Sequence, residues 1–571
     1  SHAAESRDDS GRRRPFLSAR VELWLRELRR MVASLSDQPR LVHSDDLAGN
    51  DTGVYLPLIH CRDCHVMGWG AVVSPTDRNR LKADLQGFYS AFFGLDLGTR
   101  FLFPAMSESP IDPRKLERKQ ACSECGTLNP RDAQDCNHCG SKSLLAIDVA
   151  ANQRQGRRNG APFTKSHHDC PYCDGERTLT IVGAQAASLA SVSVGQLFGS
   201  SYNDDKKLIT FSDSVQDAAH RAGFFEARTW RLNLRPAMAQ VIHEAVANGA
   251  PLTLATLPEA FEREWRAKLG EKDYIKAFLP PSIAWLRDYD KLLHEDALPE
   301  GDYLQQLVHR GLTWAMLGEF AQDAHVGRTL PRTRTAAAAI DAEVLASAAS
   351  AAAATLREKV DALRSVTGDE VAVFLQGLLA RMRRVGALWD EFLQAYARHG
   401  CNIFVYRANN PAEYAMLKTP RRPRFLSLLP YNDCDPVTGD DAGFYRDWAF
   451  KAFEGLAAQA LLDDSVLADV YRISLQALED VGVTESLEAE RPGTLVWGLR
   501  PQSLRLLDAA AEWRCDHCRN AVMDHLEAGL DGTPCRRLAC RGQYRLQTDE
   551  VPQFYRELYL SADVQRIRAR E

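Results

Sequence analysis

The cysteines constrain this chain more than any other feature of its sequence. Twelve of the fourteen cysteines fall in six close pairs, five of them Cys-x2-Cys, in a chain of 571 residues. Disulfide frameworks are typical of short secreted chains, and we find no export signal at the start of this one. The pattern therefore predicts bound metal, with zinc held by groups of four thiolates.

One complete set of four ligands lies within a short stretch of sequence: Cys122, Cys125, Cys136 and Cys139. A glycine follows each of its two Cys-x2-Cys pairs directly, as in compact zinc ribbons. We predict such a ribbon over residues 118–148. Four thiolates leave no open coordination position, so this zinc is predicted to be structural and not catalytic.

A second set requires two pairs that lie far apart in the chain: Cys61, Cys64, Cys170 and Cys173. Candidate strands flank the first pair at residues 54–60 and 68–73, and residues 178–182 after the second pair are also strand-like. The inner ribbon is then an insertion into an outer one, within a nested region over residues 51–182. An alternative scheme joins the four motifs in chain order, the first with the second and the third with the fourth.

The last set of ligands has a different spacing: Cys515, Cys518, Cys535 and Cys540. Its second half is Cys-x4-Cys, with Arg536 and Arg537 inside the turn. Four ligands are still available, so we again predict structural zinc, which makes about three zinc ions per chain. The two remaining cysteines, Cys401 and Cys434, are predicted to be buried small residues or free thiols.

The charge of the chain limits where nucleic acid can bind. A formal charge of -6 and a pI near 6.2 provide no overall basic field, so a nucleic-acid surface has to be a local patch. Two arginine clusters are candidates for contacts with phosphates. The first lies in a polar stretch predicted to be a flexible loop, and the second in a proline-stiffened connection: Arg154, Arg157 and Arg158, then Arg421, Arg422 and Arg424.

No uninterrupted apolar segment is long enough to span a bilayer. With no export signal either, we predict a soluble, cytoplasmic protein without a membrane partner.

Residues 206–221 read Lys-Lys-Leu-Ile-Thr-Phe-Ser-Asp-Ser-Val-Gln-Asp-Ala-Ala-His-Arg. Residues 208–211 form a short apolar run typical of a buried strand, and a helix is predicted to follow. Ser212 and Ser214 stand at the junction, where side-chain oxygens can cap a helix N-terminus. The same free N–H groups attract phosphate, so both serines are candidate nucleic-acid contacts.

The chain resembles large superfamily 2 helicases of the DEAD/DEAH type. The resemblance rests on the cysteine framework and on the segment 208–219, Leu-Ile-Thr-Phe-Ser-Asp-Ser-Val-Gln-Asp-Ala-Ala. The likeness is to Lhr-like, zinc-binding members found in bacterial antiphage defence systems such as Druantia and DISARM. In that family the segment opens the second RecA-like lobe. The resemblance implies ATP-driven movement on DNA, with the other helicase lobes and further defence-system subunits as partners.

The motifs that hydrolyse ATP in such motors are missing from this chain. It contains no Gly-x4-Gly-Lys-[Ser/Thr] loop, no Asp-Glu-x-[Asp/His] motif and no Gln-x2-Gly-Arg-x-Gly-Arg motif. We therefore predict no catalytic residue here and assign ATP and Mg²⁺ to a longer, full-length protein. The chain is expected to be a non-catalytic middle portion of a helicase or translocase, a hydrolase as a whole.

The predicted fold class is α+β, mainly α-helical, with inserted zinc ribbons and a partial RecA-like second-lobe element. Within it we expect helices over residues 18–35 and 336–363, a strand over 400–406 and a hairpin over 485–500. The predicted divisions are an amphipathic helix segment (1–50), the nested ribbons (51–182), the opening of the lobe (183–225), a helical insertion (226–400), a helical domain with a hairpin that resembles a winged helix (401–505), and the last cysteine site with a helix (506–571).

Two other classes of function stay open at this stage. The chain can be a stand-alone zinc-ribbon adaptor that binds nucleic acid or protein without a motor, or an enzyme of another type. The enzyme is the weaker alternative, because the sequence has no His-Glu-x2-His motif and no convincing pair of nucleophile and base.

Overall fold

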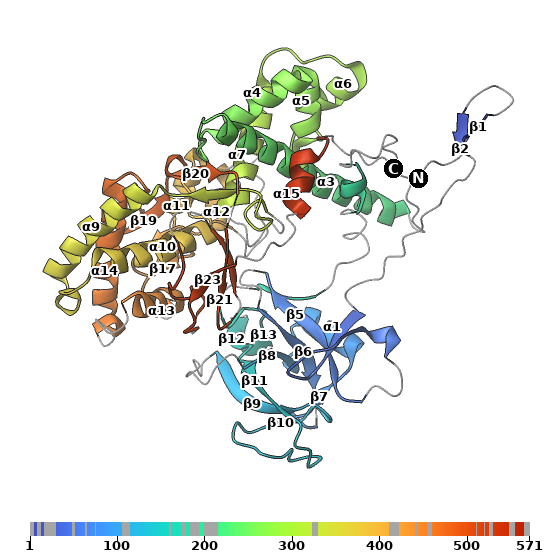
Figure 1. The fold of residues 1–571 in the computed structure, drawn as a ribbon, viewed down its shortest axis with the longest axis vertical. Coiled ribbons are helices and arrows are strands. Elements are labelled where there is room, and N and C mark those ends of the chain that lie inside the picture. Colours follow the sequence, from blue (N-terminus) through green and yellow to red (C-terminus); the bar gives the residue numbers. More distant parts are fainter. Residues whose placement is uncertain are drawn as a thin grey trace.

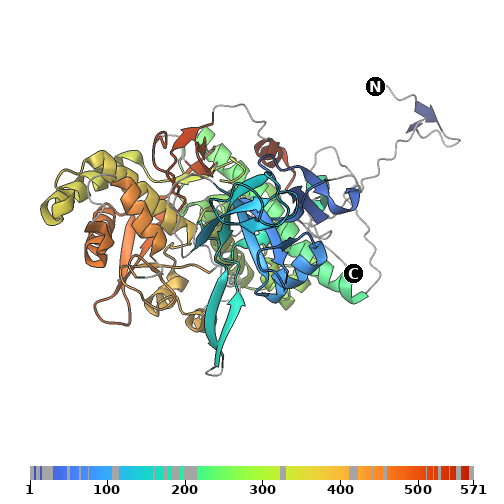
Figure 2. The same cartoon turned by 90° about the horizontal axis from the view of Figure 1, so that it is seen from below.

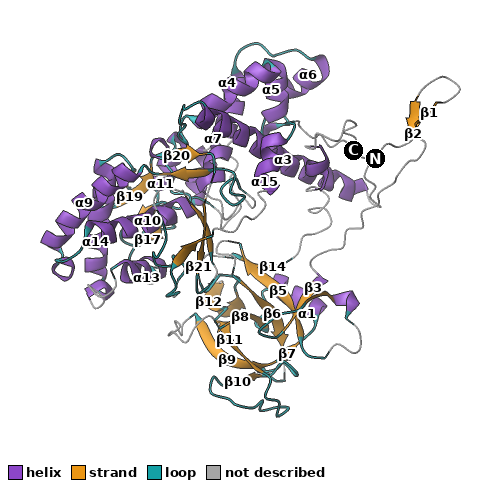
Figure 3. Cartoon of the chain, in the orientation of Figure 1, coloured by secondary structure: helices purple, strands orange, loops and turns teal. Residues whose placement is uncertain are grey.

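The computed structural model combines strands and helices in separate parts of the chain (Figures 1 and 3). Most strands lie in a module formed by residues 30–182, which we call the sheet module. Most helices lie in residues 215–509, which we call the helical module. The described residues are 5–7, 13–15, 30–47, 52–62, 66–74, 76–105, 115–158, 161–172, 177–182, 193–198, 215–321, 329–409, 422–439, 442–453, 460–509, 511–518, 520–524, 529–538, 540–547 and 554–564.

The sheet module is built on one antiparallel sheet. The described strands run in the order β10-β9-β11-β8-β6-β5-β3-β4, and β14 and β7 pair with β5 and β6. Their bounds are β3 Met31–Ser34, β4 Leu41–His43, β5 Tyr55–Cys61, β6 Met67–Val73, β7 Leu81–Lys82, β8 Thr99–Pro104, β9 Leu116–Cys122, β10 Leu128–Asn129, β11 Leu144–Ala150 and β14 Leu179–Ile181.

Each face of this sheet packs against its own apolar cluster. Successive side chains of a strand point to opposite faces, so neighbouring residues belong to different clusters. Leu58 and Leu102 belong to one apolar cluster, while their chain neighbours Ile59 and Phe101 belong to another. Helix α1 (Leu85–Gly94) adds Phe88 and Phe92 to the second cluster. The alternation explains why the strands around the first cysteine pair are recognisable from sequence.

Residues 151–165 do not form the flexible loop that their polar composition predicts. They form most of an antiparallel hairpin, β12 (Gln153–Arg158) with β13 (Ala161–Ser166), in which each residue of β12 pairs with one of β13. The hairpin is the teal element that extends away from the body in Figure 2. Backbone pairing along the whole length of both strands outweighs the loop-like composition.

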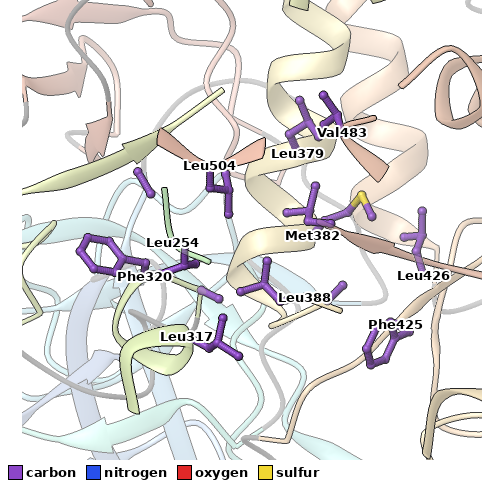
Figure 4. Close-up of a cluster of buried hydrophobic side chains, with 14 of the residues drawn as sticks. Leu254, Leu317, Phe320, Leu379, Met382, Leu388, Phe425, Leu426, Val483 and Leu504 are labelled. Atoms are coloured by element: carbon purple, nitrogen blue, oxygen red, sulfur yellow. The ribbon is translucent and has the colours of Figure 1, made fainter. Parts of the chain in front are cut away.

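The helices of the rest of the chain surround the largest apolar cluster. Figure 4 shows its centre, where Leu317 and Phe320 of α7 lie near Leu379 and Met382 of α10. The described helices are α3 Val215–Ala247, α4 Leu257–Leu269, α5 Glu271–Phe278, α6 Arg287–Glu295, α7 Tyr303–Ala321, α9 Ala342–Lys359, α10 Gly368–Arg384, α11 Gln394–Arg398, α12 Ile403–Asn409, α13 Gly443–Ala452, α14 Asp464–Asp480 and α15 Phe554–Ser561.

Short strands complete the described structure. The predicted hairpin at residues 485–500 is confirmed as β18 with β19, and it joins the small sheet β17-β16-β19-β18. The remaining strands are β1 Glu5–Arg7, β2 Arg13–Pro15, β15 Ala337–Ala339, β16 Leu426–Ser427, β17 Asp435–Pro436, β18 Thr484–Glu488, β19 Leu495–Leu499, β20 Arg505–Leu507, β21 Ala511–Cys515, β22 Ala521–Asp524 and β23 Tyr544–Leu546.

Three predictions of secondary structure are wrong. Two helical predictions fail where the residues pair with other strands, and one strand prediction fails where a side chain caps a helix. Residues 31–34, the end of the predicted helix over 18–35, form β3 because they pair with β4 and β5. Residues 337–339, expected to be helical, pair with β20 instead. The strand predicted at 400–406 is largely helix α12, which the Asn402 side chain caps by accepting from the Phe404 N–H at 2.9 Å.

Residues 208–214 of the segment that resembles a helicase lobe lie outside the described residues, and these include Ser212 and Ser214. The helix predicted to follow it is present as α3, which begins at Val215. Among the described strands, parallel pairing is confined to β16 with β17, which are two residues long. The RecA-like element therefore stays a prediction. No helix in the described part of the chain is long and apolar enough to cross a membrane.

Helices α10 and α13 pack so closely at Gly377 that adding one methyl group there is expected to destabilise the protein. A Cβ atom at Gly377 would lie 2.0 Å from Cε2 of Trp448, whose indole N–H donates to the Phe374 carbonyl at 2.9 Å. We expect Gly377→Ala to lower the free energy of unfolding by about 1–3 kcal/mol, measured by urea denaturation. Gly318→Ala is the control, because its added methyl meets no atom within 4 Å and helix propensity favours alanine. Equal stability of the two variants would contradict this packing.

Candidate metal centres

The four cysteines of the inner set come together as the sequence predicts. Their sulfur atoms all lie within 4.8 Å of one another. Cys122 and Cys139 are 3.6 Å apart, and Cys125 and Cys136 are 3.5 Å apart. Tetrahedral zinc with bonds of about 2.3 Å needs sulfur atoms about 3.8 Å apart. The group can therefore hold one metal ion, and the alternative scheme that joins the motifs in chain order is wrong.

Two similar turns shape this site. In the first, the Gly126 N–H donates to the Cys122 carbonyl at 2.9 Å, and in the second the Gly140 N–H donates to the Cys136 carbonyl at 2.9 Å. Both glycines have positive φ angles, +74° and +70°, which residues with a Cβ rarely adopt. The glycine after each pair thus lets the backbone turn sharply enough to point both sulfurs inward.

The backbone also prepares one of these thiols for metal. Burial opposes ionisation of Cys136, but hydrogen bonds from the backbone N–H groups of Cys139 and His138, together with those from the thiols of Cys125 and Cys139, outweigh it and lower the pKa of Cys136 to about 6. A thiol with such a pKa is largely ionised at neutral pH, as metal binding requires.

The C-terminal set also converges, despite its wider spacing. All four sulfurs lie within 4.8 Å of one another, with Cys515 and Cys540 at 3.6 Å and Cys518 and Cys535 at 3.7 Å. Cys515 ends β21, and its sulfur accepts from the Cys518 N–H at 3.4 Å. Hydrogen bonds with the three other thiols lower the pKa of Cys518. This group can hold a second metal ion.

The outer set is described only in part, because Cys64 and Cys173 lie outside the described residues. Cys61 and Cys170 are both buried in the same apolar cluster. The Cys61 thiol lies 3.3 Å from the Thr178 hydroxyl, and β14 pairs with β5 so that Leu179 is opposite Cys61. The strand after the second pair thus lies beside the strand before the first, as the nested arrangement requires. The third metal ion stays a prediction.

The two remaining cysteines are buried, as predicted, but they are not isolated from each other. The sulfurs of Cys401 and Cys434 lie 3.7 Å apart, and the Phe425 N–H donates to Cys401 at 3.2 Å. Their separation of 33 residues carries no recognisable spacing signal, so sequence reasoning missed this contact.

The two arginine clusters differ in their surroundings. Arg154 is exposed on β12 of the projecting hairpin and forms an ion pair with Asp169 at 2.8 Å. In the second cluster Arg421 lies outside the described residues, Arg422 pairs with Asp433 at 2.6 Å, and Arg424 donates to the Cys434 carbonyl at 2.9 Å. All three arginines have an acidic or carbonyl partner, but the Arg154 side chain is 60% exposed and those of Arg422 and Arg424 only 13% and 26%, so the hairpin is the better candidate for phosphate contacts.

A cavity of about 320 Å³ lies beside Trp389, between the β18–β19 hairpin and α7. Its lining includes three carboxylates and Arg500, which pairs with Glu485 at 3.0 Å. The lining contains no cysteine, histidine, serine or lysine. This lining therefore provides no Ser–His or Cys–His pair of nucleophile and base.

No protein-family model, curated protein or solved structure matches the chain. The two cysteine clusters and the hairpin are therefore interpreted from their own geometry.

Proposed function

We propose that the chain is a non-catalytic portion of an ATP-dependent DNA helicase or translocase, in which metal-stabilised modules form a scaffold that contacts DNA. The observation that carries the proposal is the projecting hairpin β12–β13, which carries basic and aromatic residues on one face. The assignment of this scaffold to a helicase motor rests on the resemblance of residues 208–219 to superfamily 2 helicases. The proposed antiphage role rests on the same resemblance.

The register of the hairpin supports contact with a nucleic-acid strand. Arg154 pairs with Lys165, and Gly156 pairs with Phe163, so all four positions share one face of the two-stranded ribbon. The Lys165 ammonium lies 5.6 Å from the centroid of the Phe163 ring. Basic groups of this kind contact phosphates, and an aromatic ring beside them can stack with an unpaired base.

The metal ions have a structural role in this proposal. Four thiolates per ion leave no position for water or substrate, so the ions stabilise small units that lack a large core of their own. ATP and Mg²⁺ would bind to lobes that this chain does not supply. Residues 1–571 alone are accordingly expected to show no DNA-stimulated ATP hydrolysis, measured in a preparation free of contaminating ATPases.

Charge reversal on the hairpin tests the DNA contact. We expect Arg154→Glu with Lys165→Glu to weaken binding of labelled single-stranded DNA about tenfold or more at low salt, because two phosphate contacts are lost. The slope of log affinity against log salt should fall by about 1 for each contact removed. Fluorescence anisotropy across a salt series measures both quantities.

A matched control and a clear negative outcome complete this test. Arg364→Glu reverses a charge on the helical module, where Arg364 forms an exposed ion pair with Asp361, and should leave DNA binding unchanged. If the hairpin variant binds DNA as tightly as the parent at low salt, the hairpin is not the DNA contact. The adaptor alternative would then be favoured, with a protein as its partner.

A further inference from the structure

The turn between Cys535 and Cys540 is two residues longer than the other cysteine turns, which are Cys-x2-Cys. Its extra residues contact both modules of the protein. We propose that metal in the C-terminal cluster acts as a clasp, which holds the sheet module against the helical module through this turn. In Figure 1 strands β21 and β23 of the cluster lie between α13 and the sheet module.

On one side the turn contacts the sheet module at Tyr172. The Arg537 guanidinium carbon lies 4.2 Å from the centroid of the Tyr172 ring, and the Leu538 N–H donates to the Tyr172 carbonyl at 2.9 Å. The side chains of Arg537 and Tyr172 are only 3% and 5% exposed, so this cation–π contact is shielded from water. The Tyr172 ring also packs edge-on against Phe103 of β8, which connects the contact to the core of the sheet.

On the other side the same turn is held by the helical module. Lys451 of α13 is buried, and its ammonium donates to the Cys535 carbonyl at 3.2 Å and to the Arg537 carbonyl. Asp447, one turn earlier on α13, pairs with Lys451. Helix α13 and the sheet module therefore contact neighbouring residues of one short turn.

The shape of this turn depends on its two cysteines being held together. The backbone N–H of Arg537 donates to the Cys535 sulfur at 3.4 Å, so the backbone at Arg537 depends on the position of this ligand. A divalent ion with four thiolates carries a net negative charge, and this charge offsets the burial of the Arg537 cation. Without the ion, both the closure of the turn and the compensating charge are lost. Metal occupancy and docking of the modules are therefore coupled.

The docking also determines where the β12–β13 hairpin stands relative to the helical module, because the hairpin belongs to the sheet module. Its importance for DNA rests on the proposed function. The clasp itself does not, since it involves only contacts within the chain.

Variants of the full chain separate the metal from the contact. Cys535→Ala should remove one metal ion and increase the radius of gyration in small-angle X-ray scattering. Arg537→Ala and Tyr172→Ala should keep every metal ion and still increase this radius. In both of these variants we expect the Leu538 amide to exchange hydrogen at least tenfold faster, because its acceptor moves away.

Cys125→Ala is the matched control, because it removes a ligand of the inner cluster, which is not part of the turn. It should lose one metal ion with little change in the Leu538 exchange rate or in the separation of the modules. The proposal is overturned if Cys535→Ala loses its metal while scattering and Leu538 exchange stay as in the parent. It is also overturned if Arg537→Ala and Tyr172→Ala leave both measurements unchanged. None of these measurements uses DNA, so they do not depend on the DNA-binding test.

Discussion

Cys125→Ala is expected to unfold the inner four-cysteine unit and leave the rest of the protein folded. The free energy of binding a structural zinc ion, about 10–16 kcal/mol in small zinc-dependent units at neutral pH, is largely free energy of folding. Besides the cysteines, the buried apolar side chains described over residues 118–148 are Ala121, Leu128, Leu145 and Ile147. Without the ion, hydrophobic burial alone is not expected to keep the two turns in place.

Metal analysis and hydrogen exchange together measure this effect. The parent should contain at least two zinc ions per chain, and three if the outer set is complete; the variant should contain one fewer. Backbone amides over residues 122–143 should lose protection, whereas those of α10 and α14 keep it. Replacing Cys401 by alanine is the control, since it removes a buried thiol that is not in either cluster, and it should leave the metal content unchanged. A parent with no bound metal would contradict the prediction outright.

Asp435→Ala is expected to cost about 3–5 kcal/mol of stability, because it leaves Arg381 buried without its partner. The Arg381 guanidinium donates two parallel hydrogen bonds to the Asp435 carboxylate, at 2.8 and 2.7 Å, and the Tyr445 hydroxyl donates a third. Both charged side chains are at least nine-tenths buried. They join α10 to β17, and Tyr445 adds α13 to the same network.

The dependence of stability on pH gives a second measure of this pair. Burial opposes ionisation of Asp435, but Arg381, Arg424 and the hydrogen bonds outweigh it and lower the pKa of the carboxyl well below its usual value. A lowered pKa in the folded state stabilises the protein above the unfolded-state pKa, about 3.9, and this contribution is lost as pH falls below it. In Asp435→Asn the free energy of unfolding should therefore fall less steeply with decreasing pH in the acid range than it does in the parent.

Denaturation by urea at neutral pH, with an exposed pair as control, tests the size of the effect. Asp361→Ala removes the partner of Arg364, and because both side chains are exposed the change should be below about 1 kcal/mol. Replacing the buried pair by apolar residues, Arg381→Met with Asp435→Leu, should recover part of the lost stability. A loss for Asp435→Ala no larger than that for Asp361→Ala would rule out a buried, structurally important pair.

Ligand spacing and short-range periodicity by themselves determined the local units of this protein. The inner and C-terminal cysteine sets are each confined to a short stretch of sequence, so the four ligands of each set are close to one another along the chain. Both sets converge as predicted. The strands around Cys61 and the hairpin β18–β19 follow from alternation and turn residues, which act between neighbours in the chain.

Only the tertiary structure decided the features that depend on residues far apart in sequence. Strand β3 forms because partners in β4 and β5 lie beside it, and the contact between Cys401 and Cys434 has no signal in their spacing. The longer turn of the last cysteine set illustrates the same limit. Its four ligands could be recognised from sequence, but the role of Arg537 became visible only with Tyr172 next to it. These contacts join segments that are not neighbours in the chain, and no periodicity or local spacing encodes which segments meet.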